Sequence, residues 1–116
     1  AIRKELETHF YAKEMISAEL LQQYSNAARY GAHAQATFAG ISTRFYAADT
    51  KAAFAKLSVP FLMIWGEENQ QNPAEHFTAA EKMKDFGTFA LFEKTASLPH
   101  IENSRAFLEH MTEFLK

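Results

Sequence analysis

The stretch VPFLMIWG, residues 59–66, decides how this chain folds. Five apolar residues, Phe61 to Trp65, lie between a proline and a glycine without a polar interruption. A short apolar run between two such breakers is typical of a strand that is buried on both faces of a parallel sheet. Because Val59 precedes Pro60, it is pushed away from helical geometry, and any helix upstream should end before it.

Helix and strand signals alternate after this run. Asn72 is expected to cap a helix that has Pro73 at its first position, Glu75 in a capping box and Gly87 as its end. TFALFE, residues 88–93, predicts a second strand. A final helix is expected to carry inward Phe107, Leu108, Met111, Phe114 and Leu115. The order strand, helix, strand, helix predicts an α/β fold with a parallel sheet and right-handed crossovers.

The first half of the chain, residues 1–58, is predicted to be helical. Ser17 is a good N-cap for one helix, which Gly31 should interrupt, and Asp49 opens a short helix that ends before Ser58. A set of aromatic residues would either line an apolar substrate channel or belong to the core, and the sequence leaves both interpretations open. These aromatics are Phe38, Phe45, Tyr46 and Phe54.

Composition limits the classes of function. A chain of 116 residues with 47% hydrophobic content suffices for one compact domain. Twelve basic and 14 acidic residues are interleaved, which disfavours nucleic acid as a partner. The absence of cysteine excludes disulfides and thiolate zinc sites and favours a cytoplasmic location. The longest apolar run is too short to span a bilayer, so we expect a soluble protein with no membrane partner.

The two loops that follow the predicted strands carry the residues of most interest, because reactive groups gather at the carboxyl ends of parallel strands. VPFLMIWGEENQQNP, residues 59–73, and ASLPHIENSRAF, residues 96–107, resemble the two loops that carry the catalytic Asp and His in the α/β-hydrolase superfamily. The positions in register with that family's pattern are Val59, Pro60, Gly66, Pro73, Pro99, Glu102 and Phe107. The resemblance implies that residues 59–116 are the carboxyl-terminal β-α-β-α portion of a hydrolase core, and that residues 1–58 are a helical cap or lid forming one compact unit with it.

The sequence departs from the family pattern at both functional positions. Register from Gly66 places the family's acid on Asn69, and register in the second loop places its histidine on Ser97. A neutral amide cannot stabilise an imidazolium, and a serine cannot act as a general base near neutral pH. We therefore expect Ser97 to point toward the turn that holds Asn69. His100 should lie nearer the final helix, either as a displaced base or as a partly exposed loop histidine.

Other candidate groups are weaker. Glu67 and Glu68 could supply a displaced carboxylate, although solvated turn residues are the simpler interpretation. Two Glu-His pairs, at residues 75–76 and 109–110, lack the His-Glu-x-x-His spacing of a zinc site, so we expect no metal and no cofactor. None of the four glycines forms a Gly-x-Ser-x-Gly nucleophile elbow.

The resemblance implies an esterase-like or dehalogenase-like hydrolase that acts on a small, largely apolar substrate. Because this chain lacks the elbow, we interpret it as a carboxyl-terminal fragment with a degenerate triad that is not catalytically competent alone. The alternative is a non-catalytic small-molecule-binding or protein-interaction module derived from that fold. Two strands make an incomplete parallel sheet, so we also expect a partner, which is either the missing amino-terminal core or a second copy of the chain. A start at Ala1 suggests a processed product or a piece of something larger.

Overall fold

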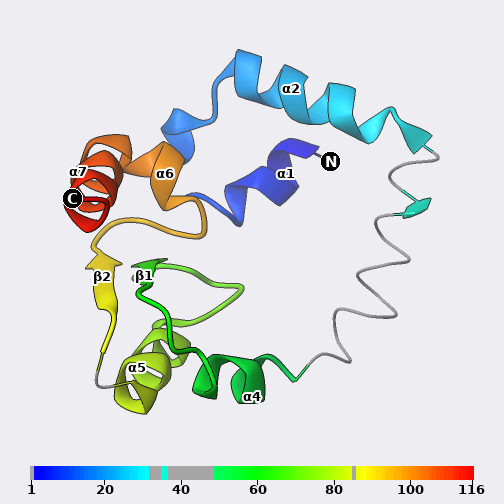
Figure 1. Ribbon diagram of the computed structural model, residues 1–116. Coiled ribbons are helices and arrows are strands. Elements are labelled where there is room, and N and C mark those ends of the chain that lie inside the picture. The colour runs from blue at the N-terminus through cyan, green and yellow to red at the C-terminus, as the bar shows by residue number, and fades with distance from the viewer. Residues whose placement is uncertain (1, 32–34, 37–48, 85) are drawn as a thin grey trace. The chain divides into compact units, whose positions relative to one another are not determined.

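The computed structural model describes residues 2–31, 35–36, 49–84 and 86–116 (Figure 1). The chain divides into two units at Leu57 and Ser58. Residues 3–16 group with residues 58–116, and we call these two segments the sheet unit. Residues 17–57 form the second group, which we call the helical unit.

The sheet unit is built on two parallel strands (Figure 1). β1 (Leu62–Gly66) pairs with β2 (Thr88–Phe92), so that Leu62 lies opposite Thr88 and Gly66 lies opposite Phe92. Both strands occur where the apolar runs predicted them, and α5 (Ala74–Met83) connects them. The expected mixed α/β fold with a parallel strand pair is therefore confirmed, while the assignment to the carboxyl-terminal part of a hydrolase stays a prediction.

The start of α5 differs from the expectation. Pro73 is the N-cap residue, and no side chain caps the helix, so the predicted cap by Asn72 is wrong. Asn72 belongs instead to the preceding turn: its N–H donates to Asn69 Oδ1 at 3.0 Å, and its carbonyl accepts from Trp65 Nε1 at 2.9 Å. The helix ends at Met83, and Gly87, with a φ of +123°, makes the turn into β2.

The buried side chains of the sheet unit come from the amino-terminal segment, α5, β2 and the loop after β2. The amino-terminal segment contains α1 (Ile2–Glu7) and the short 3₁₀ helix η1 (Lys13–Met15). The buried side chains are Leu6, Phe10, Ile16, Phe77, Ala90, Phe92, Thr95 and Ala96. The expectation that β1 is buried on both faces is wrong, because its residues 62–65 are only half-buried. In the described structure β1 has one neighbouring strand, β2, and β2 is itself partly open to solvent, because Leu91 is 41% exposed.

Two helices complete the sheet unit, α6 (Pro99–Glu102) and α7 (Ser104–Phe114). Phe107, Met111 and Phe114 of α7 are half-buried, as the spacing predicted. Leu108 and Leu115 are 63% and 73% exposed, so their predicted inward orientation is wrong. The reason is helical geometry: at about 100° per residue, Phe107, Met111 and Phe114 fall within about 60° of one another around the helix, and the two leucines lie further round.

The helical unit contains α2 (Ala18–Ala28) and α4 (Thr50–Ala55) in its described part. The predicted cap at Ser17 is confirmed, because Ser17 Oγ accepts from the Leu20 N–H at 3.0 Å. The helix predicted to begin at Asp49 is also present, and Asp49 Oδ1 caps it by accepting from the Ala52 N–H at 2.9 Å. Phe54 is half-buried on α4, whereas Phe38, Phe45 and Tyr46 lie outside the described residues. Within the described ranges, every helix is too short or too polar to cross a membrane.

Candidate functional site

The loops that follow β1 and β2 lie together at the carboxyl edge of the sheet. Backbone hydrogen bonds of 2.9 Å join them, from Glu67 N–H to the Phe92 carbonyl and from Glu68 N–H to the Thr95 carbonyl. A pocket of about 390 Å³ opens beside them. Its walls include Trp65 from β1, Asn69 and Gln71 from the first loop, Ser97 and Leu98 from the second, and His9 from the amino-terminal segment.

Gly66 allows the two loops to approach this closely. A Cβ atom at residue 66 would lie 1.8 Å from the Ala96 carbonyl oxygen and 2.4 Å from the Thr95 carbonyl oxygen. Both atoms belong to the backbone, so neither can move aside at low cost. The glycine is therefore required by the approach of the second loop to the end of β1.

Asn69, which the resemblance puts in register with a catalytic acid, is bonded within its own turn. Its Oδ1 atom accepts the backbone N–H groups of Gln71 at 3.1 Å and Asn72 at 3.0 Å. This is an Asx-type turn, in which a side-chain oxygen satisfies nearby backbone donors. The oxygen that would orient an imidazole in the family's arrangement is thus occupied by the backbone.

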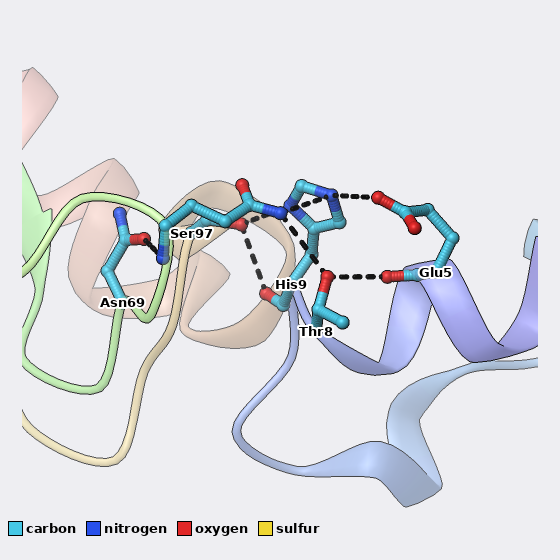
Figure 2. Close-up of polar contacts among 6 residues, drawn as sticks. Glu5, Thr8, His9, Asn69 and Ser97 are labelled. Carbon is cyan, nitrogen blue, oxygen red and sulfur yellow. Dashed lines mark hydrogen bonds and ion pairs between the residues drawn. The ribbon is translucent and has the colours of Figure 1, made fainter.

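Ser97, which the resemblance puts in register with a catalytic histidine, contacts the imidazole of His9, a residue that the sequence did not single out. Figure 2 shows its Oγ atom beside the ring of His9, 2.6 Å from Nδ1. The two backbones are also joined, because the Ser97 N–H donates to the His9 carbonyl at 3.1 Å. His9 is partly buried, with 26% of its side chain exposed. No local signal marks His9, since it lies 88 positions before Ser97 and outside any motif.

The surrounding bonds determine which ring nitrogen of His9 carries the proton. Thr8 Oγ1 donates to the Glu5 carbonyl at 2.7 Å, so toward Gln71 it can only accept. Gln71 Nε2 lies 3.2 Å from Thr8 Oγ1 and 2.9 Å from His9 Nε2, and it donates one of its two protons to each of these atoms. His9 Nε2 is then an acceptor, and Nδ1–H donates to Ser97 Oγ.

This assignment defines the chemistry of the pair. The Ser97 hydroxyl keeps its proton, which points to the His9 carbonyl at 3.4 Å, so the imidazole does not activate Ser97 as a nucleophile. The Glu5 carboxylate lies 3.9 Å from His9 Nε2 and is largely exposed, so it contributes little. The His9–Ser97 pair therefore joins the amino-terminal segment to the second loop.

Glu102 makes the same connection with its carboxylate. Oε1 accepts the N–H groups of Tyr11 at 2.7 Å and Ala12 at 3.0 Å, and Oε2 accepts the Ala96 N–H at 2.7 Å. Three charge-assisted bonds to the backbone hold the amino-terminal segment and the second loop in place. Sequence analysis identified Glu102 only through the resemblance and did not assign it this contact.

The displaced candidates lie away from this cluster. His100 is exposed and is absent from the pocket wall, and its ring centroid lies 6.0 Å from that of Phe107 at the start of α7. Glu67 and Glu68 are exposed in the turn. In the part of the chain that the structure describes, no group of three His, Asp or Glu side chains is placed to hold a metal ion.

Comparison with known proteins adds no relative. No protein-family description matches the chain, and a search of curated proteins finds no match. The hydrolase resemblance and the catalytic assignments of Asn69, Ser97 and His100 therefore stay predictions.

Proposed function

We propose that this chain is the carboxyl-terminal part of an α/β-hydrolase-like protein and that it does not hydrolyse esters by itself. The parallel strand pair supports the proposal, as does the meeting of the two loops at the carboxyl edge. Two residues that carry the resemblance also hold the loops at the carboxyl edge of the sheet. Gly66 permits the close approach of the loops, and Glu102 binds three backbone N–H groups.

One observation carries the catalytic half of the proposal. Asn69 Oδ1 is bound to two backbone N–H groups of its own turn, and the resemblance puts Ser97 in register with the family's histidine. A hydrolase triad needs a charged acid that orients a histidine, and Asn69 and Ser97 cannot fill these two roles. His9 does not substitute, because its Nδ1 atom donates to Ser97.

An ester-hydrolysis assay tests the catalytic half. Purified chain is incubated with p-nitrophenyl acetate, and the rate is expected to equal that of buffer. His9→Ala and His100→Ala are the matched variants. A rate that copurifies with the chain through several columns, and that either substitution abolishes, would overturn the proposal.

The sequence that precedes Ala1 in the gene product tests the family half. A Gly-x-Ser-x-Gly elbow after a predicted strand is the expected finding. An upstream sequence without strand and helix alternation would contradict the relationship, whatever the ester assay shows.

A second candidate function is non-catalytic binding of a small molecule, and the pocket favours it. The pocket lies at the carboxyl edge of a parallel sheet, where ligands of α/β proteins gather, and its volume of about 390 Å³ suits a small ligand. This function needs neither a nucleophile nor a general base.

A further inference from the structure

The pocket geometry points to a binding site for a small uncharged molecule that carries hydroxyl or amide groups, with a monosaccharide as the best fit. Asn69 and Gln71 would bind its polar groups, and Trp65 would contact its apolar face. The inference rests on the binding function proposed above and names the class of ligand. It is independent of the hydrolase relationship.

The side-chain amides of Asn69 and Gln71 are each held at one end by hydrogen bonds to protein groups. Asn69 is held through Oδ1 by two backbone N–H groups, and among the described residues its Nδ2 has no partner. Gln71 is held through Nε2 by Thr8 and His9, and within the same residues its Oε1 has no partner. Both residues line the pocket, so one amide donor and one amide acceptor, each held by its other end, lie at the pocket wall. Such preorganisation lowers the entropy cost of binding a ligand.

Charge selects against ionic ligands. No Lys, Arg, Asp or Glu lines the pocket, and the His9 Nε2 atom in its wall faces the Gln71 amide. An anion or a cation would lose part of its hydration on entry without meeting an opposite charge. A ligand with neutral hydroxyl or amide groups loses less and can pair with both amides.

Trp65 supplies a rigid apolar part of the pocket wall. Its Nε1–H donates to the Asn72 carbonyl at 2.9 Å, which fixes the indole, and Ile64 and Leu98 are further apolar parts of the wall. An indole beside amide donors and acceptors matches the two sides of a pyranose ring, which has an apolar C–H face and a rim of hydroxyls. A purely apolar ligand would leave both amides unpaired.

Trp65 also provides the measurement, because it is the chain's single tryptophan. Its fluorescence is followed while the chain is titrated with N-acetylglucosamine, with glucosamine as the cationic probe and glucuronate as the anionic probe. We expect a saturable change with the neutral sugar and at least about tenfold weaker binding of both charged sugars, a difference of about 1.4 kcal/mol. No saturable response to the neutral sugar, or equal or tighter binding of a charged sugar, would overturn the inference.

A pair of variants locates the site. Asn69→Asp keeps the oxygen that accepts from the backbone but replaces the free Nδ2 donor with a carboxylate oxygen. Gln70→Glu adds the same charge in the same turn, at an exposed residue that does not line the pocket. We expect Asn69→Asp to weaken binding about tenfold and Gln70→Glu to leave it within about twofold. Equal effects of the two substitutions, or no effect of Asn69→Asp, would contradict the site.

Circular dichroism shows whether each variant is folded. If Asn69→Asp does not fold, the titrations of the unmodified chain with three sugars still decide the ligand class. The ester assay fails or succeeds separately, since fluorescence reports occupancy and not turnover.

Discussion

Glu102 is the residue whose side chain connects the most distant parts of the sheet unit. Its carboxylate accepts from Tyr11, Ala12 and Ala96, so a single half-buried group orders the amino-terminal segment and the second loop together. His9 and Ser97 add a direct bond between the same two segments. The pocket wall depends on these contacts, because His9 reaches it only when the amino-terminal segment is in place.

Replacing Glu102 with Gln should destabilise the sheet unit. The amide offers a single oxygen and turns an N–H toward at least one backbone donor, so we expect a loss of about 1.5–3 kcal/mol in the free energy of unfolding. Urea denaturation measures it. Glu109→Gln is the matched control, since Glu109 makes an exposed pair with Arg105, and its loss should stay below about 0.5 kcal/mol. A Glu102→Gln loss no larger than that of the control would contradict this role.

The proton on His9 can be moved by changing Gln71. In the unmodified chain we expect neutral His9 to carry its proton on Nδ1, because Gln71 donates to Nε2. Gln71→Glu offers only acceptor oxygens, so Nε2 should become protonated. ¹⁵N chemical shifts of the ring distinguish the two states, and Gln70→Glu should keep the proton on Nδ1. A proton on Nε2 in the unmodified chain would contradict the bonding assigned to the pocket.

At the scale of elements, local sequence accounts for most of what is observed. Breaker residues around residues 61–65 and 88–93 predicted both strands. The cap at Ser17 and the helix start at Asp49 were predicted correctly because each depends on contacts within four residues. The cap of α5 could not be predicted the same way. The backbone of Asn72 is bonded to Trp65 and Asn69 in the preceding turn. The sequence offers no way to predict that these bonds are made and the Asn72 cap is not.

Gly66 provides the test at this scale. Gly66→Ala would place a methyl group 1.8 Å from the Ala96 carbonyl oxygen, so the end of β1 and the second loop must separate. We expect a loss of more than about 4 kcal/mol, or no folding at all, measured by urea denaturation and circular dichroism. Gly31→Ala is the control, because no described atom lies within 4 Å of its added Cβ, and its effect should stay within about 1 kcal/mol. Comparable losses in both variants would show that the close approach at Gly66 is unimportant.

At the scale of the whole molecule, the contacts that build the candidate site join residues far apart in the chain. The His9–Ser97 bond spans 88 positions and the Gln71–His9 bond spans 62, and neither is marked by spacing or composition. The resemblance to a family pattern singled out Asn69 and Ser97. Their bonding partners are the backbone of the turn for Asn69 and His9 of the amino-terminal segment for Ser97. The sequence thus predicted that the two loops meet at the carboxyl edge of the sheet. It did not predict that His9 of the amino-terminal segment also lines the pocket there.

Incomplete coverage of the sheet unit predicts self-association. In the described structure β1 pairs with β2 alone, and Leu91, Leu108 and Leu115 are exposed apolar side chains. Burying such surface is favourable, and an unpaired strand edge recruits another chain, so we expect a dimer or larger assembly.

Light scattering coupled to gel filtration measures the mass over a concentration series. If α7 takes part, the double substitution Leu108→Lys and Leu115→Lys should shift the chain toward monomer, because each lysine places a charge where apolar surface would be buried. Tyr30→Lys, at a residue of the helical unit that is 67% exposed, is the control and should leave the assembly unchanged. An unmodified chain that stays monomeric at high concentration would contradict the prediction. It would show that the exposed leucines and the unpaired strand edge do not require a second chain to cover them.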